Sequence, residues 1–297
     1  MQPKAPAAKP DAHSKEGILY VVATPIGNMA DITLRALQTL KDVDLVAAED
    51  TRHTRRLLSF YEIRNSLISY HEHNEERRSQ ELVKRLLSGE SIAIVSNAGT
   101  PTISDPGYRL VKAAVEQNIK VVPIPGVTAA ITALSASGMP TDAFRFLGFL
   151  PRKRGKRSKE LERLVDESST MIFYESPKRI LELLNDMYNI LGDRYGVLSR
   201  ELTKRYEEFI YGRLTDMIDS IKIRESLKGE FTLVVAGSMV RGETSPEVLR
   251  KDIRKELKDG RFRLSDVAAE LAVRHGLSRK KVYEEALVIK KSIDESE

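Results

Sequence analysis

Short apolar runs alternate with stretches of helical spacing along the N-terminal part of the chain. The first run, residues 18–23, has the length of a strand that is buried on both faces of a parallel sheet. Leu34, Leu37 and Leu40 then recur at helical spacing behind Asp31, which predicts a helix with Asp31 as its N-cap. Further strands are predicted at 45–48, 92–95 and 120–123, and further helices at 75–87 and after Gly107. This alternation predicts an α/β fold with a mainly parallel sheet.

The pattern changes after residues 138–140. The next segment predicts short strands at 171–174, 195–199, 209–211 and 231–236, with helices at 180–189 and 216–223. Such a segment is typical of a smaller α/β domain with some antiparallel pairing. A helical stripe at 264–272, a turn containing Gly276 and a second helix from 280 outline a helix-turn-helix. Either a helical hairpin that caps the second domain or a nucleic-acid contact fits this last unit.

These elements predict four segments. We expect a disordered leader at 1–16, an N-terminal α/β domain at 17–138, a second α/β domain at 139–240 and a helical extension at 245–297, with a linker over 237–245. The leader has no apolar core of the kind that a secretory signal needs, and no apolar run approaches the ~18 residues of a membrane span. We therefore expect a cytoplasmic protein that does not enter a membrane.

The amino-acid composition mainly excludes the kinds of chemistry that need cysteine. The 297 residues contain no Cys, which rules out disulfides, thiolate metal sites and Cys nucleophiles. The formal charge of +5 is small for a nucleic-acid-binding protein. However, the segment 152–163 alone holds seven basic and two acidic residues, a surplus of the same size. A solvated helix face or a phosphate contact explains such a run, and its place at the domain junction favours the phosphate contact. The candidate RNA-binding residues are Arg152, Lys153, Arg154, Lys156 and Arg157.

Three loops rich in small residues and proline follow predicted strands of the first domain, at 24–28, 96–107 and 123–130. Ligands of open α/β sheets bind at the carboxyl ends of the strands, and loops of this composition let the backbone approach a ligand closely. Ordinary turns explain each loop singly, but three at successive strand ends favour a binding site. The chain has no dinucleotide-binding or P-loop signature after these strands, which leaves open a nucleoside that is bound by backbone groups.

At this point the motifs resemble those of a known family. The most specific segments are ATPIGN at 23–28, DITLRAL at 31–37, AAEDTR at 47–52, SYHEHN at 69–74, AGTP at 98–101, SDPG at 104–107, FYESP at 173–177 and RELTK at 200–204. Over residues 17–237 the chain closely resembles the bacterial ribosomal RNA small subunit methyltransferase I family of the tetrapyrrole methylase superfamily. The resemblance implies two α/β domains with S-adenosylmethionine bound in the cleft between them. It also implies a homodimer, and as acceptor the ribose 2′-hydroxyl of a cytidine in the decoding region of 16S ribosomal RNA within the small ribosomal subunit.

The resemblance also implies the residues that bind the cofactor. The first loop would contribute Ile26, the second Ala98, Gly99, Thr100 and Ile103, the third Thr128 and Ala129, and the second domain Glu175 and Leu202. One position departs from the family pattern, because Asn97 stands where members often carry Asp. We expect Asn97 to stabilise the turn, a role that Asn fills as well as Asp.

Transfer of a methyl group to a hydroxyl depends on positioning and on a group that takes or orients the proton. We expect Glu49 or Asp50 to orient the hydroxyl and Arg52 to hold a phosphate, with Asp105, His71 and His73 as further candidates. The competing interpretation is that an Asp–Arg pair closes the strand end or caps the next helix. His71 and His73 lack a third ligand, so we predict no metal site.

Two rival functions use the same fold. One is methylation of a tetrapyrrole or another small acceptor, and the other is a non-catalytic RNA-binding factor in ribosome assembly. The basic segment and the helical extension disfavour a small acceptor, since such a substrate requires neither. The intact set of three loops disfavours a protein that has lost catalysis.

Overall fold

The computed structural model describes residues 16–224, 226–238, 246–258, 264–275, 277 and 279–294. The chain divides into two compact units, Met1–Ala129 and Ala130–Glu297, and each is described by itself. This division falls at the start of α5 (Ala129–Ser135), whereas the sequence placed the domain boundary after residue 138. The predicted leader, apart from Glu16, and most of the predicted linker lie outside the described residues.

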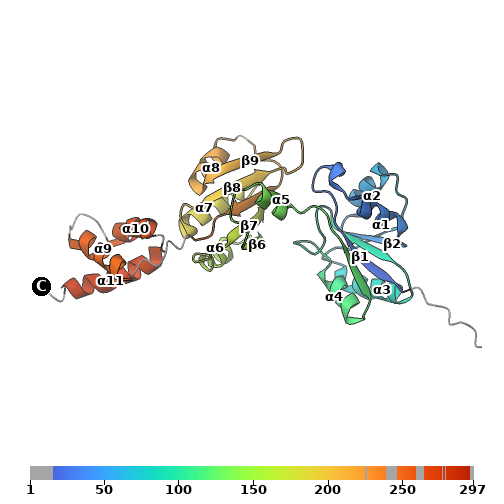
Figure 1. Ribbon diagram of the computed structural model, residues 1–297, viewed down its shortest axis with the longest axis horizontal. Coiled ribbons are helices and arrows are strands. Elements are labelled where there is room, and N and C mark those ends of the chain that lie inside the picture. Colours follow the sequence, from blue (N-terminus) through green and yellow to red (C-terminus); the bar gives the residue numbers. More distant parts are fainter. Residues whose placement is uncertain are drawn as a thin grey trace, which may run out of the picture. The chain divides into compact units, whose positions relative to one another are not determined.

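The first unit is a parallel sheet between two helical layers (Figure 1). Its strand order is β3 (Leu67–Ser69), β2 (Leu45–Ala48), β4 (Ile92–Val95), β1 (Ile18–Val22) and β5 (Lys120–Ile124), and all neighbours pair in parallel. On one face pack α1 (Leu34–Asp42) and α2 (Thr51–Phe60), and on the other α3 (Glu75–Leu87) and α4 (Tyr108–Glu116). Every residue of β2 and β4 is buried, as expected for central strands covered on both sides. The predicted parallel α/β fold is confirmed.

One predicted cap was wrong. The hydroxyl of Thr33, not the carboxylate of Asp31, accepts the N–H of Ala36 at 3.1 Å and so begins α1. Asp31 instead ends a 3₁₀ turn, Met29–Asp31, that is capped by Asn28. A helix begins where a side chain reaches the free N–H groups of its first turn, and Thr33 stands next to the first helical residue whereas Asp31 does not.

The second unit contains a mixed sheet. Its order is β6 (Phe144–Phe149), β7 (Thr170–Glu175), β10 (Phe231–Val235), β8 (Tyr195–Arg200) and β9 (Glu208–Arg213), with only β6 and β7 parallel. The core of this sheet includes residues of α6 (Arg154–Glu162), α7 (Ile180–Leu191) and α8 (Leu214–Lys222). The predicted antiparallel pairing is therefore present.

Three further helices form a separate core of their own. These are α9 (Pro246–Lys258), α10 (Leu264–His275) and α11 (Arg279–Asp294), and their shared core includes Ile253, Leu271 and Val282. The two helices of the predicted helix-turn-helix are confirmed as α10 and α11, while Gly276 in its turn lies outside the described residues. Within the described part of the chain, no helix is long and apolar enough to cross a membrane.

A buried ion pair joins α6 to α7 and corrects one predicted RNA contact. The side chain of Arg157 is 1% exposed, and its Nε donates to Asp186 Oδ2 at 2.8 Å. Arg157 lies four residues before the buried Leu161, so both face inward from α6. A guanidinium buried in this way cannot reach a phosphate. Arg157 therefore leaves the predicted RNA-binding set and takes a structural role.

This ion pair predicts a stability effect. Replacing Asp186 with Ala leaves the Arg157 charge buried without its main partner and is expected to lower the free energy of unfolding by about 3–5 kcal/mol. The double variant Arg157→Met with Asp186→Leu should recover most of this loss, because it removes both charges. Urea denaturation measures both effects. The matched control is Arg163→Met, which removes an exposed pair with Glu160 and should cost less than about 1 kcal/mol. An equally small loss in Asp186→Ala would contradict the assignment.

Candidate active site

Two loops of the first unit are joined by backbone hydrogen bonds beyond the ends of their strands. The N–H of Thr24 donates to the carbonyl of Gly99 at 2.9 Å, and the N–H of Gly99 donates back to Thr24 at 3.0 Å. The buried hydroxyl of Thr24 also donates to the carbonyl of Ser96 at 3.1 Å. The loops that follow β1 and β4 are therefore held against each other. Thr24 and Ser96 were not among the residues predicted as functional, although both lie within the loops that the sequence indicated.

The third predicted loop meets the first two. The hydroxyl of Thr100 donates to the carbonyl of Val127 at 3.5 Å. A Cβ on Gly126 would lie 2.8 Å from the Cβ of Ala23, so only glycine allows this approach. A Cβ on Gly99, whose φ is +80°, would lie 3.5 Å from Ile26 Cγ2 and 3.7 Å from the Val127 carbonyl. The structure thus brings together the predicted Ile26, Gly99 and Thr100 with the segment that leads into Thr128 and Ala129.

The second loop presents an apolar side chain outward. Ile103 is 43% exposed, and its neighbours Thr102 and Ser104 both have positive φ, at 76° and 64°. Residues other than glycine adopt such backbone angles at an energetic cost, and these angles concentrate at functional sites. Ala98, at the start of the same loop, is also exposed. These two predicted cofactor contacts are accessible to a ligand.

Two carboxylates lie beside these loops. Glu49 directly follows β2, and its Oε2 accepts the backbone N–H of Asn97 at 3.0 Å. Burial raises the pKa of the Asp105 carboxyl to about 6, the nearby Glu49 carboxylate adds to the rise, and a hydrogen bond with the Ser96 side chain opposes it. Glu49 and Asp105 are therefore close enough to repel each other. A carboxylate pair of this kind is suited to holding or accepting a proton.

Glu49 and Asp50, which are adjacent in sequence, have different roles in the structure. The Oδ1 of Asp50 accepts the backbone N–H of Arg52 at 2.8 Å and caps α2. This hydrogen bond lowers the pKa of Asp50, which is exposed at the surface. The capping interpretation therefore fits Asp50. Arg52 is exposed in the first turn of α2 and is accessible to an anion.

The expected turn role of the Asn97 side chain is not seen. The hydrogen bond that fixes this position is made by the backbone N–H of Asn97, which donates to Glu49. The Oδ1 of Asn97 is buried and has no partner among the described residues. The amide therefore does not hold the turn through its oxygen.

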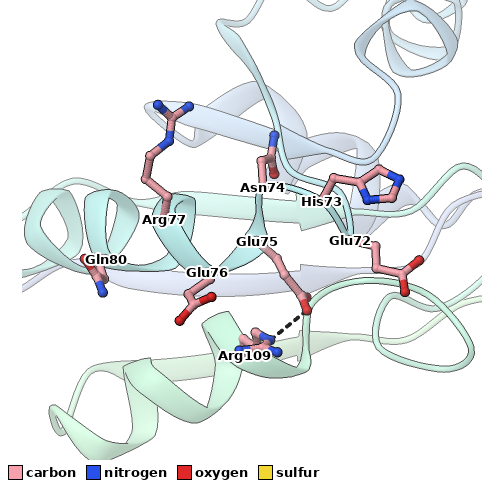
Figure 2. Close-up of a pocket in the computed structure, with 8 residues that line it drawn as sticks. All are labelled: Glu72, His73, Asn74, Glu75, Glu76, Arg77, Gln80 and Arg109. Atoms are coloured by element: carbon pink, nitrogen blue, oxygen red, sulfur yellow. Dashed lines mark hydrogen bonds and ion pairs between the residues drawn. The ribbon is translucent and has the colours of Figure 1, made fainter.

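The two candidate histidines lie in the turn just before α3. Their ring centroids are 5.9 Å apart, and His71 Nε2 lies 3.2 Å from Asn74 Nδ2. His73 lines an open hollow of about 510 Å³. Glu75 from α3 pairs there with Arg109 from α4, and the two atoms lie 2.8 Å apart; Figure 2 shows these side chains together. Apart from the further candidate His73, the hollow contains none of the residues predicted for catalysis or cofactor binding. Within the described residues, no group of three His, Asp or Glu side chains has the arrangement of a metal site.

The predicted residues of the second unit have defined surroundings. The buried Glu175 accepts the N–H of Ser176 and pairs with Arg179 at 2.9 Å, so its carboxylate is already neutralised. Leu202 is 6% exposed between Glu201 and Thr203, whose φ angles are 53° and 65°. The remaining basic candidates have exposed side chains that phosphates can reach, namely Arg152, Lys153, Arg154 and Lys156.

Comparison with known proteins identifies relatives over most of the chain. Residues 18–218 match the family model of the tetrapyrrole (corrin/porphyrin) methylases. The ribosomal RNA small subunit methyltransferase I of Halalkalibacterium halodurans is 51% identical over 75% of this chain and 77% of its own length. Its namesakes from Synechocystis and Escherichia coli are 48% and 45% identical and cover 91% and 93% of this chain, and 98% and 96% of their own lengths.

Solved structures share the fold at low identity. Uroporphyrin III C-methyl transferase from Thermus thermophilus has a TM-score of 0.54 at 17% identity and covers 74% of this chain and 97% of its own. A structure of that enzyme in complex with S-adenosyl homocysteine has a TM-score of 0.53, also at 17% identity, over 73% of this chain and 97% of that one. Diphthine synthase has a TM-score of 0.56 at 14% identity, with coverage of 74% and 90%. These structures confirm the fold class.

The raised pKa of Asp105 predicts how stability changes with pH. Because the pKa in the folded state, about 6, exceeds the ordinary value of 3.8, the folded protein binds this proton more tightly than the unfolded chain. Ionisation therefore destabilises the fold as the pH rises from about 4 to about 6. Asp105→Asn removes this cost, and we expect it to raise the free energy of unfolding at pH 8 by about 1–2 kcal/mol, discounted for partial exposure.

Urea denaturation of wild type and variant at several pH values between 4 and 8 measures this effect. The gain should be smallest at pH 4, where the carboxyl of Asp105 is protonated in the folded protein and about half protonated in the unfolded chain. Asp42→Asn is the matched control, since Asp42 is exposed on α1 of the same unit and should give no such pH-dependent gain. A variant no more stable than wild type at pH 8 would show that Asp105 is not destabilised by burial.

Proposed function

Because this chain belongs to the family of ribosomal RNA small subunit methyltransferase I, within the tetrapyrrole methylases, we propose that it methylates the ribose 2′-hydroxyl of a cytidine in 16S ribosomal RNA. The methyl donor is S-adenosylmethionine, and the enzyme is an rRNA (cytidine-2′-O-)-methyltransferase. The observation that carries the proposal is the joining of three loops at the carboxyl ends of β1, β4 and β5. Ligands of open α/β sheets bind at this edge.

The loops fit a nucleoside donor. They offer glycines that permit close approach, an outward aliphatic side chain at Ile103 and an exposed Ala98, and they contain no phosphate cradle. When bound, S-adenosylmethionine supplies a methyl group on a positively charged sulfur. The residues that would hold it are Ile26, Ala98, Gly99, Thr100, Ile103, Thr128 and Ala129, with Glu175 and Leu202 from the second unit. Since Arg179 neutralises the carboxylate of Glu175, that residue contributes shape rather than a free charge.

The acceptor side uses residues at the end of β2. Glu49 is held by the N–H of Asn97 and orients the acceptor hydroxyl, while the exposed Arg52 holds a phosphate of the RNA through paired hydrogen bonds. Asp50 supports this arrangement by capping the helix that carries Arg52. Positioning of this kind accounts for much of the rate of a displacement in which acceptor, methyl carbon and sulfur must lie in line.

The RNA partner is approached through the exposed basic side chains that begin α6. Arg152, Lys153, Arg154 and Lys156 supply this charge, and Arg157 anchors the helix below them. A small acceptor such as a tetrapyrrole needs no such cluster. The family resemblance also implies a homodimer that acts in the cytoplasm on the small ribosomal subunit. The dimer, the compartment and this form of the substrate remain predictions.

Labelled S-adenosylmethionine and small ribosomal subunits that lack the modification test the function. We expect one methyl group per subunit, on a cytidine ribose of the decoding region. Its position is mapped by the resistance to alkali of the phosphodiester bond that follows the methylated ribose. Naked 16S RNA in a parallel reaction identifies the preferred form of the substrate. A methyl group on a base, or no transfer to either substrate, would overturn the proposal.

The basic cluster predicts a salt effect. Replacing Arg152, Lys153, Arg154 and Lys156 with Ala should weaken binding to small subunits and reduce the slope of log K against log salt by about 3, because each phosphate that is no longer neutralised lowers the slope by ~0.7. Filter binding across a salt series measures both quantities. A control that removes four exposed charges from the first unit should keep the wild-type slope within about one unit, namely Lys41, Arg64, Lys84 and Lys112 to Ala. Equal slopes for both variants would reject the cluster as the RNA contact.

A further inference from the structure

Phe149 is the last residue of β6, and its side chain is 56% exposed. The strand lies at the edge of the mixed sheet and pairs in parallel with β7. A single exposed apolar side chain is ordinary on a protein surface. Phe149 is different, because an irregularity of the backbone gives this side chain its direction and because a cluster of cations follows it in the chain.

A β-bulge sets the direction of Phe149. Between Phe146 and Gly148 the register of β6 with β7 shifts by one residue, and the φ of Gly148 is +60°. Side chains of a regular strand alternate between its two faces, which would place Phe149 on the face of Leu147. The side chain of Leu147 packs against the core of the sheet. Because of the bulge, Phe149 lies instead on the opposite face, together with Phe146.

Three aromatic rings meet on this opposite face. The ring centroid of Tyr174 lies 5.0 Å from that of Phe146 and 5.7 Å from that of Phe149, and both contacts are edge-to-face, a favoured geometry. The hydroxyl of Tyr174 accepts the backbone N–H of Ala130, in the first turn of α5, at 3.0 Å. Tyr174 is therefore held at both ends, and it supports the exposed ring of Phe149. Ala130 directly follows Ala129 of the proposed donor site.

The exposed basic side chains at the start of α6 begin three residues after Phe149. Three residues span at most about 11 Å, so the backbone of Arg152 lies within this distance of Phe149. The residue between them that follows the strand, Leu150, is buried, and its carbonyl accepts Arg179 Nη2 at 2.8 Å. The connection is therefore anchored. Cations that contact the backbone, next to an aromatic ring that stacks on a base, are the combination that binds unpaired nucleic acid.

We propose that Phe149 stacks on an unpaired base of the RNA substrate and so holds a nucleotide of the acceptor strand. This inference rests on the proposed function and adds to it a residue that binds the substrate. Proteins recognise unpaired RNA by stacking its splayed bases on aromatic side chains. Methyl transfer also requires that the acceptor nucleotide be held in position, since the attacking oxygen must lie in line with the methyl carbon and the sulfur.

Equilibrium binding of the full-length protein to small subunits that lack the modification tests this contact. Phe149→Ala should weaken binding by about 5–150-fold, the range that the loss of one base–aromatic stack produces. Phe149→Tyr keeps the ring and should stay within about 3-fold of wild type, whereas Phe149→Leu is apolar without a ring and should lose affinity as the alanine variant does. The slope of log K against log salt should stay within about one unit of wild type in all three, since no phosphate contact is lost.

Phe144→Ala is the matched control. Phe144 is an exposed phenylalanine at the other end of β6, away from the basic cluster in sequence, and its replacement should change the affinity by less than about 3-fold. Equal losses of affinity in Phe144→Ala and Phe149→Ala would overturn the inference.

A fluorescent reporter detects the stacking directly. The chain contains no tryptophan, so Phe149→Trp places a single indole at the site. Addition of small subunits should quench its emission, because a base that stacks on the indole is in contact with it. Wild type at the same concentration supplies the baseline for the fluorescence of the ribosomal proteins. Phe144→Trp is the control and should keep its emission. A merely structural role for Phe149 does not produce this difference between the two reporters.

Further outcomes separate the inference from its alternatives. Wild-type affinity in Phe149→Ala, or unquenched emission in Phe149→Trp, would overturn it. Wild-type affinity with weaker self-association in sedimentation would assign the ring to a second copy of the chain. The Kd for S-adenosylhomocysteine, measured by calorimetry, should not change in Phe149→Ala, and a rise in step with the loss of RNA affinity would also overturn the inference. In each of these cases wild type still methylates the ribose, whereas failure of the proposed function appears as wild type that transfers no methyl group to it.

Discussion

The reciprocal backbone hydrogen bonds between Thr24 and Gly99 are the constraint on which the candidate site depends. Strands of a parallel sheet end with backbone groups that the next loop must satisfy. Here the backbone groups of each loop are hydrogen-bonded by the other loop. The chain leaving β1 is therefore held against the chain leaving β4. Ser96 and Gly99 take their positions from this bridge. The positive φ of Gly99 is the local condition for it.

Burial explains which parts of the fold the sequence predicts. The bounds of β2, β4 and α3 match the prediction because a strand covered on both faces forms an unbroken apolar run and a long amphipathic helix repeats its pattern. In contrast, α2 was not predicted, since it buries only Thr54, Leu57 and Leu58 and its other positions are mostly polar. The three-residue strand β3 is too short to show a pattern.

The direction of individual side chains limits how much of the candidate site the sequence predicts. The sequence indicates all three loops because glycine and proline reveal where the backbone turns. It does not separate Glu49 from Asp50, which are neighbours, because the turn into α2 sends one toward Asn97 and the other onto the helix end. The same applies to Arg157, where helical periodicity relative to Leu161 outweighs the basic character of the segment. Asp105 stands out only when its contacts with Glu49 and Ser96 are known.

Charge is distributed differently in the two units. In the second unit, arginines pair with the buried carboxylates of Asp186 and Glu175, and these ion pairs fix helices and loops. In the first unit, Glu49 accepts the backbone N–H of Asn97, and burial together with the Glu49 charge raises the pKa of the Asp105 carboxyl. The neutral amide of Asn97 keeps a third negative charge away from the pair. A protein tolerates such an arrangement where a raised pKa serves the chemistry, and in this chain it lies next to the loops proposed to hold the methyl donor.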